Sequence, residues 1–177
     1  MKVFKEYQRF NQGWFVLLLI IVFLALVYSL FKEFEQIDQK DITEVLPLAA
    51  TVAVTVLAYS LIFALKLKTR IDEKGITYQF SPIHLKPKVI PWQNISKCYV
   101  REYSPILEYG GWGLRGLFRS KLLRMGEKGK AYNVRGTIGI QLVLVDESKI
   151  LIGTQKTEQA KEVVRNYSYK VANIKIS

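Results

Sequence analysis

The chain has 177 residues, half of them hydrophobic, and a formal net charge of +11. Its single cysteine, Cys98, excludes an intrachain disulfide, and together with the single histidine, His84, it provides too few ligands for a zinc site of the usual type. The charge is uneven, because residues 1–65 hold 5 Lys/Arg and 6 Asp/Glu whereas residues 66–177 hold 21 and 9. The C-terminal part is therefore basic and favours an anionic partner.

Two uncharged apolar runs occupy residues 14–31 and 45–65. At about 1.5 Å per residue, each run is long enough as a helix to cross the hydrocarbon core of a bilayer. The segment after the first run, KEFEQIDQ, has no small-residue cleavage site of the kind that ends a signal peptide. We therefore expect a transmembrane helical hairpin over residues 14–67, with helices at 14–31 and 45–67 and a loop at 32–44.

The distribution of Lys and Arg predicts the orientation of this hairpin. Three Lys/Arg lie in the N-terminal tail, residues 1–13, and four lie in the nine residues after the second run, against two in the connecting loop. The positive-inside rule then places both termini in the cytoplasm and loop 32–44 outside. Neither run holds an Asp, Glu, Lys, Arg or His, which argues against an ion or proton pathway through the helices.

From residue 68 onward the apolar residues follow a period of two, which is typical of half-buried strands. We expect seven antiparallel strands, the third of them at a sheet edge because Pro87 and Pro91 lack the N–H that a ladder needs. A closing helix begins after Thr157, its expected N-cap, with apolar residues at i, i+3, i+4 and i+7. The expected strands cover residues 68–72, 76–80, 86–92, 97–103, 131–135, 138–145 and 149–154, and the apolar helix positions are Ala160, Val163, Val164 and Tyr167.

The stretches IDEKGITY at residues 71–78 and VIPWQNI at 89–95 resemble the bacterial pleckstrin-homology-like (PH-like) domain families, which commonly follow one or two membrane helices. The resemblance implies a membrane-anchored α+β protein of the bacterial inner membrane. Its cytoplasmic PH-like domain, residues 68–177, would be a seven-stranded antiparallel barrel or sandwich with a C-terminal helix. These families share no catalytic residues, so the resemblance implies a binding or assembly module and not an enzyme. Because the turn at 72–75 is acidic at its centre, phosphoinositide recognition is not implied.

The stretch GGWGLRG, residues 110–116, contains the dinucleotide-binding pattern GxGxxG. A dinucleotide site needs a strand before the glycines, a helix after them and an acidic residue about 20 positions on. Here Pro105 disfavours a strand before the glycines, no long helix is indicated after them, and the nearest acids beyond them are Glu127 and Asp146. We interpret the glycines as residues that shape the backbone.

Basic and apolar residues are interleaved along residues 104–130, as in a segment that contacts an anionic bilayer interface or a protein partner. A second copy of the chain is one such partner; alternatively, the segment only completes the core of its own domain. A different function would be a membrane-bound enzyme or transporter accessory subunit that binds a phosphate-containing ligand through this Gly-rich loop. The predicted lipid or partner contacts are Trp112, Arg115, Arg119, Lys121, Arg124, Lys128 and Lys130.

The sequence lacks paired carboxylates, a metal-ligand cluster and a nucleophile–base pair. We therefore expect no enzyme activity, no metal and no cofactor. A catalytic pair would need His84, which we expect to be an exposed loop histidine within SPIHLKP. The basic residues are scattered over all the expected strands and match no nucleic-acid-binding module. A nucleic-acid partner is therefore not expected.

Overall fold

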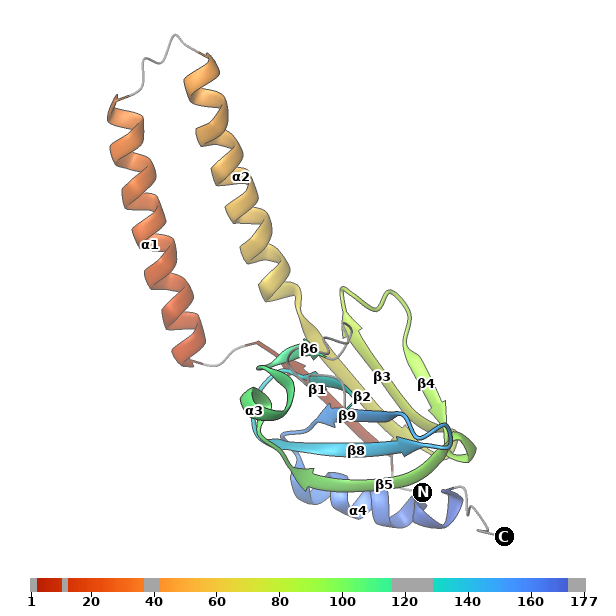
Figure 1. The fold of residues 1–177 in the computed structure, drawn as a ribbon. Helices are drawn as coiled ribbons and strands as arrows, with labels where there is room; N and C mark the ends of the chain where they lie inside the picture. The colour runs from red at the N-terminus through yellow and green to blue at the C-terminus, as the bar shows by residue number, and fades with distance from the viewer. Residues whose placement is uncertain (1–2, 11–12, 37–41, 116–128, 172–177) are drawn as a thin grey trace. The chain divides into compact units, whose positions relative to one another are not determined.

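The computed structural model describes residues 3–10, 13–36, 42–115 and 129–171 (Figure 1). The chain forms two compact units. We call Phe10–Ala64 the helical unit, and the unit that joins Met1–Arg9 to Leu65–Ser177 the sheet unit. The sequence-based division, with a tail at 1–13 and a domain at 68–177, differs from this one because the N-terminal segment belongs to the sheet unit.

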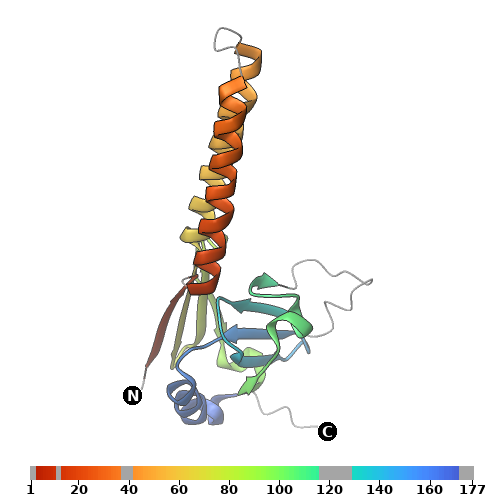
Figure 2. The ribbon, with the colours of Figure 1, turned by 90° about the vertical axis from the view of Figure 1, so that its left-hand side faces the viewer.

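The helical unit consists of α1 (Gly13–Gln36) and α2 (Ile42–Ala64), which lie side by side in Figure 1 and one in front of the other in Figure 2. Both helices are long and apolar enough to cross a membrane, over Val16–Glu35 and Val45–Ala64, and these windows are not buried. The two apolar helices predicted from the sequence are therefore confirmed. Their bounds differ from the prediction, because α1 extends to Gln36 and α2 ends at Ala64.

Four hydroxyl groups of α2 donate hydrogen bonds to backbone carbonyl groups. The Tyr59 hydroxyl of α2 donates to the carbonyl O of Leu19 in α1 at 2.7 Å, and the Tyr59 ring packs edge-on against Phe23 with centroids 5.7 Å apart. Such bonds lower the cost of placing hydroxyl groups in apolar surroundings. Three further hydroxyl groups of α2 donate to the carbonyl O four residues earlier, those of Thr51, Thr55 and Ser60.

The first sheet contains four antiparallel strands in the order β1-β2-β3-β4. β1 pairs with β2 from Phe4 opposite Ile71 to Arg9 opposite Lys66, so a segment predicted as part of a tail is a strand. β4 lies at the sheet edge, as its prolines predicted. The strands are β1 (Phe4–Arg9), β2 (Lys66–Asp72), β3 (Gly75–Ser81) and β4 (Lys88–Pro91).

The second sheet contains five strands in the order β5-β8-β9-β7-β6. β7 and β9 run parallel, whereas the other neighbouring strands are antiparallel. A short 3-10 helix, Trp92–Asn94, connects the two sheets, and α3 (Pro105–Tyr109) lies between β5 and β6. The strands are β5 (Ile95–Glu102), β6 (Gly113–Arg115), β7 (Lys130–Asn133), β8 (Ile138–Leu144) and β9 (Lys149–Gly153).

Nine strands in two sheets lie in the described residues, where the sequence predicted seven antiparallel strands. The α+β class is confirmed, whereas the seven-stranded antiparallel barrel is not. β1 does not show the expected apolar pattern because two of its buried residues, Glu6 and Gln8, are polar. β6 does not show it because three residues are too few to reveal a period. In the strand order, β6 and β7 lie on the side of β9 that is away from β5 and β8. β7 is therefore a neighbour of β9, and these two strands form the parallel pair.

Buried polar contacts attach β1 to the chain that follows β9. The Glu6 carboxylate accepts hydrogen bonds from the Thr154 hydroxyl and from the N–H of Gln155, both at 2.7 Å. Gln8 Nε2 donates to the carbonyl O of Gly153 at 2.6 Å. The polar residues that obscure β1 in the sequence are therefore the residues that hold it in the structure.

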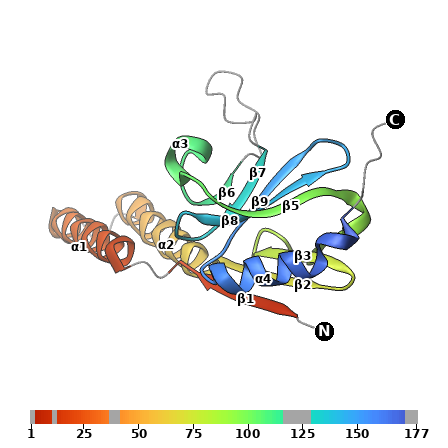
Figure 3. The same cartoon turned by 90° about the horizontal axis from the view of Figure 1, so that it is seen from below.

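α4 (Thr157–Tyr167) packs against β1, β5 and β8 (Figure 3). All four predicted apolar positions of the helix are buried, so the amphipathic helix is confirmed. Thr157 is the first helical residue, and Lys156 occupies the N-cap position instead. Tyr167 stacks on Trp92 with ring centroids 5.4 Å apart, which joins α4 to the connection between the two sheets.

His84 is buried, and its predicted exposure is wrong. Its ring packs against the rings of Tyr78 and Tyr132, which also contact each other, and its Nδ1 accepts a hydrogen bond from the N–H of Phe80 at 3.2 Å. Burial, together with the positive charge of Lys88, lowers the pKa of His84. The neutral imidazole is therefore a structural group of the first sheet.

Candidate functional site

The predicted contact segment leaves the second sheet after β5 and begins with α3. Ser104 caps this helix, because its Oγ accepts a hydrogen bond from the N–H of Leu107 at 3.3 Å, and Pro105 occupies the first position. Gly110 ends the helix with a φ of 72°, and its N–H donates to the carbonyl O of Ile106 at 2.8 Å. Ser-Pro at the start and Gly at the end are the local signals that define α3.

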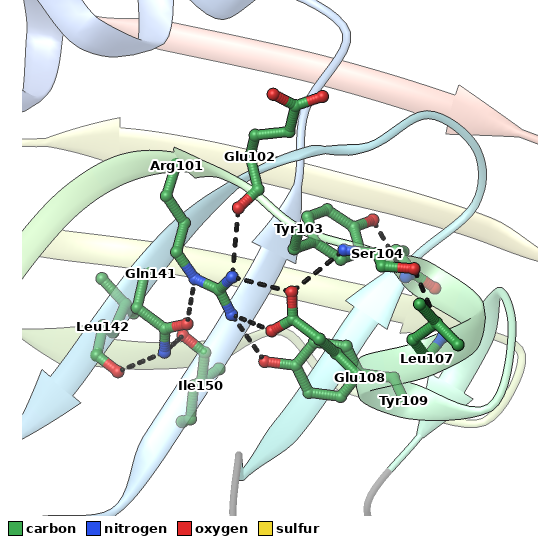
Figure 4. Close-up of polar contacts among 11 residues, drawn as sticks. Arg101, Glu102, Tyr103, Ser104, Leu107, Glu108, Tyr109, Gln141, Leu142 and Ile150 are labelled. Atoms are coloured by element: carbon green, nitrogen blue, oxygen red, sulfur yellow. Dashed lines mark hydrogen bonds and ion pairs between the residues drawn. The ribbon is translucent and has the colours of Figure 1, made fainter.

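Arg101 of β5 fixes α3 to the sheet (Figure 4). Its guanidinium donates from Nη1 to Glu108 Oε1 at 3.1 Å and from Nη2 to Glu108 Oε2 at 2.8 Å, which makes a bidentate ion pair. Nη2 also donates to the Tyr109 hydroxyl at 3.3 Å. The hydrogen bond with Glu108 is the largest cause of the raised pKa of Arg101, so the guanidinium stays charged.

Gln141 of β8 holds Arg101 from a second direction (Figure 4). This side chain is buried, and its Oε1 accepts a hydrogen bond from Arg101 Nε at 3.1 Å. Its Nε2 donates to the carbonyl O atoms of Leu142 and Ile150 at 3.2 and 3.3 Å. The position of α3 is therefore determined by a connected polar network in which each charged group has several partners.

Two tyrosines continue this network into the core of the second sheet. Tyr103 and Tyr109 pack edge to face with ring centroids 5.9 Å apart, in a buried cluster with Ala131 and Leu151. Burial raises the pKa of Tyr103 to about 12, so its hydroxyl stays neutral. That hydroxyl accepts a hydrogen bond from Asn133 Nδ2 at 2.9 Å, which connects the cluster to β7.

The glycine-rich stretch leads from α3 into β6 and not into a helix. The N–H of Gly113 donates to Asn133 Oδ1 at 2.8 Å, and Trp112 Nε1 donates to the carbonyl O of Gly136 at 3.1 Å. A strand therefore lies where a dinucleotide site needs the N-terminus of a helix. Positive φ angles of 72°, 120° and 112°, which favour glycine, occur at Gly110, Gly111 and Gly113.

Three of the seven predicted contact residues lie in the described part of the chain. Trp112 is half-buried, whereas Arg115 and Lys130 are exposed. Arg115 lies opposite Ala131, so Arg115 and Lys130 lie on the last two strands at one edge of the second sheet. The other four, Arg119, Lys121, Arg124 and Lys128, lie outside the described residues.

Two apolar residues of α3 belong to the same segment, and sequence analysis missed them. Ile106 is 62% exposed and Leu107 is 89% exposed. The Ser-Pro start signal could have revealed α3, but five residues do not show which side of a helix faces water. We call the set of Ile106, Leu107, Trp112, Arg115 and Lys130 the α3–β6 surface; within it, Arg115 shares the face of Ala131, and Lys130 lies on the opposite face of the same sheet edge.

Metal-ligating and nucleophilic groups are few in the described residues. These residues hold no group of three or more His, Cys, Asp or Glu side chains that could bind a metal ion. Burial raises the pKa of the Cys98 thiol to about 12, so this thiol is protonated at neutral pH and is a poor nucleophile. The segment does present exposed cations on β6 and β7 and exposed apolar side chains on α3.

Comparison of the chain with protein-family models, with curated proteins and with solved structures gave no match.

Proposed function

We propose that the protein is a non-catalytic binding or assembly module that α1 and α2 anchor in a membrane. Large apolar side chains in the middle of both helices, among them Leu24, Val54 and Leu57, are exposed. Such a surface suits lipid better than water. From the PH-like resemblance and the Lys/Arg distribution, we place the anchor in the bacterial inner membrane with both termini in the cytoplasm.

We further propose that the sheet unit has PH-like architecture. Seven strands remain when β6 and β7 are set aside: the four strands of the first sheet, and β5, β8 and β9 of the second. Neighbours within each of these two groups are all antiparallel, and α4 follows the last strand. This order supports the resemblance of residues 71–78 and 89–95, and it makes residues 103–137 an insertion between two strands of the proposed PH-like core.

The α3–β6 surface is the proposed contact site of the module. The observation that carries this proposal is the 89% exposure of Leu107 on a helix that Arg101 and Glu108 hold in place. An apolar side chain on a fixed helix loses little conformational freedom when it binds, which favours affinity. Arg115 and Lys130 add positive charge, so the partner is an anionic lipid surface or an acidic protein surface.

Site-specific photo-crosslinking of the full chain in membranes tests this contact site. A benzophenone amino acid replaces Leu107, and the matched control carries it at Val145, an exposed apolar residue outside the α3–β6 surface. We expect an adduct at position 107 that is absent at position 145. A lipid adduct appears as a mass shift of the intact protein, and a protein adduct appears as a new band.

A charge-reversed variant shows whether the adduct depends on the proposed cations. Arg115→Glu combined with Lys130→Glu should lower the yield at position 107 several-fold, because like charges then repel the partner. An adduct yield at position 107 no greater than that at position 145 overturns the contact site.

A further inference from the structure

The loop between β3 and β4, residues 82–87, exposes two large apolar side chains. Ile83 is 53% exposed and Leu85 is 89% exposed. Between them, the buried ring of His84 lies 5.8 Å from the ring of Tyr78 and 5.3 Å from that of Tyr132. The inward position of the histidine leaves its two apolar neighbours at the surface.

Hydrogen bonds fix the backbone of this loop. The N–H of His84 donates to the carbonyl O of Phe80 at 2.7 Å, and His84 Nδ1 accepts from the N–H of Phe80. Gln79 Nε2 donates to the carbonyl O atoms of His84 and Leu85 at 3.0 and 3.3 Å. The two apolar side chains are therefore presented by an ordered backbone, which keeps the entropy cost of a contact low.

The strand register places the loop beside the connection to α2. Ser81, the last residue of β3, lies opposite Lys66 of β2, and Lys66 lies opposite Arg9 of β1. Neighbouring strands are about 4.8 Å apart, and only Leu65 separates Lys66 from the last residue of α2. If α2 crosses a bilayer, the Ser81 end of the first sheet is therefore within a few residues of the bilayer surface.

The charges near this end of the sheet complement an anionic lipid surface. Residues 64–71 and 81–91 contain no Asp or Glu. The acidic residues of the β2–β3 turn, Asp72 and Glu73, lie at the opposite end of those strands. Apolar side chains flanked by cations are typical of segments that lie at the headgroup level of a bilayer. The cations of the two segments at or toward this end are Lys66, Lys68, Lys86 and Lys88, whereas Arg70 forms an ion pair with Asp72 at the opposite end.

We propose that Ile83 and Leu85 insert into the anionic lipid interface of the same membrane that α1 and α2 cross. The proposal rests on the membrane-spanning part of the proposed function, and it is independent of the α3–β6 surface. Loop 82–87 then attaches the sheet unit to the bilayer at a third point, in addition to the chain connections to α1 and α2.

Val145 provides a matched contrast within the sheet unit. It is 50% exposed, close to the value for Ile83. Its N–H donates to the carbonyl O of Asn94 at 3.0 Å. Asn94 lies just beyond Pro91, the last residue of β4, whereas loop 82–87 comes just before Lys88, the first residue of β4. Val145 is therefore an exposed apolar residue at the other end of β4, where the proposal expects no lipid contact.

Full-length protein reconstituted in liposomes that contain phosphatidylglycerol tests the proposal. Cys98→Ala removes the native thiol, and the environment-sensitive fluorophore NBD is attached to single cysteines. Lipids with a nitroxide near the headgroup serve as the quencher. We expect bluer emission and several-fold stronger quenching at positions 83 and 85 than at 145. The labelled variants are Ile83→Cys, Leu85→Cys, Val145→Cys and, in α2, Val54→Cys.

The label at position 54 separates failure of this proposal from failure of the membrane anchor. If the label at 54 is in lipid while the labels at 83 and 85 behave like that at 145, the loop proposal is overturned and the anchor stands. If the label at 54 is in water, the anchor fails and the loop proposal fails with it.

Two further measurements separate anionic lipid from other occupants of the loop surface. Lys86→Glu with Lys88→Glu, or removal of phosphatidylglycerol, should reduce quenching at position 83 several-fold. Quenching that neither change affects overturns the assignment to anionic lipid. If a second copy of the chain covers the loop instead, the NBD shift rises with protein density at constant lipid composition, which also overturns the proposal.

Discussion

Two segments of the sheet unit, β1 and α3, each have an acidic side chain among their attachments, but the surroundings of the two carboxylates differ. Glu6 of β1 is 3% exposed, and it accepts hydrogen bonds from a hydroxyl group and a backbone N–H. Glu108 of α3 forms an ion pair with Arg101, and these side chains are 15% and 25% exposed. Water can replace lost partners at the second site far more easily than at the first.

This difference indicates that accessibility to water, more than the number of hydrogen bonds, decides how much each attachment stabilises the fold. A buried donor left without an acceptor carries its full desolvation cost, whereas an accessible one is rehydrated. The comparison therefore predicts an order for the loss of stability when each group is removed. The loss should be largest for the buried carboxylate of β1 and smaller for the ion pair of α3. It should be smaller again for the buried histidine of loop 82–87, and smallest for a surface ion pair of α4.

The largest expected effect is that of Glu6→Ala. Two charge-assisted hydrogen bonds are lost and the Thr154 hydroxyl is left buried, so the free energy of unfolding should fall by about 3 kcal/mol. Denaturant unfolding of the full chain in detergent, followed by tryptophan fluorescence, measures this loss. Glu6→Gln keeps an acceptor and should cost less. A loss for Glu6→Ala that is no larger than the loss for Arg101→Ala contradicts the comparison.

Arg101→Ala should have a smaller and more local effect. The bidentate pair with Glu108 is lost, but water reaches the remaining carboxylate, so we expect a loss of about 1.5 kcal/mol. Hydrogen exchange should accelerate at the α3 amides of residues 106–109 while the amides of β1 stay protected. Arg101→Lys keeps the charge without the fork geometry, so its free energy of unfolding should lie between those of the unsubstituted chain and Arg101→Ala. Equal acceleration in β1 and α3 would show that the two attachments are not independent.

His84 should make stability depend on pH. Because the pKa of His84 is lowered in the fold, its contribution is fully present above the ordinary value of 6.5 and is lost as the pH falls through the folded-state pKa. Thermal unfolding of the full chain between pH 7.5 and pH 5 measures this loss. His84→Asn retains an acceptor near the position of Nδ1 and should abolish the pH dependence in this window. If His84→Asn keeps the same pH dependence of stability, that dependence comes from titratable groups other than His84.

The smallest expected effect is that of Lys161→Ala on α4. Lys161 Nζ lies 2.9 Å from Glu158 Oε1, but the two side chains are 51% and 84% exposed. Exposed pairs of this kind contribute little, so no measurable change in the unfolding midpoint is expected. A loss of stability as large as that of Arg101→Ala would show that accessibility to water does not decide how much each attachment stabilises the fold.

The sequence predicts the elements whose burial follows a simple period, and it misses those that are held by polar contacts. α1, α2 and α4 are visible because their apolar residues are continuous or recur at helical spacing. β1 is missed because Glu6 and Gln8 occupy positions where the period of two requires apolar residues. Their partners lie almost the whole chain away, at Gly153, Thr154 and Gln155, which no local pattern reveals.

The candidate site is predicted in part for the same reason. The basic and aromatic composition of residues 104–130 drew attention to Trp112, Arg115 and Lys130, which lie on or beside β6 and β7. The exposure of Leu107 depends on the attachment of α3 by Arg101, a contact between residues that composition does not link. The buried position of His84 likewise follows from Tyr132, which belongs to the other sheet.

The chain between two paired strands contains both apolar helices, and this order has a consequence for biogenesis. β1 is synthesised before α1 and α2, and it has no partner until β2 follows them. If only one helix entered the bilayer, β1 and β2 would lie on opposite sides of it and could not pair. Pairing of β1 with β2 therefore requires that both helices enter the bilayer or that neither does, and a chain with one inserted helix would leave the edge of β2 unpaired and open to pairing with another chain.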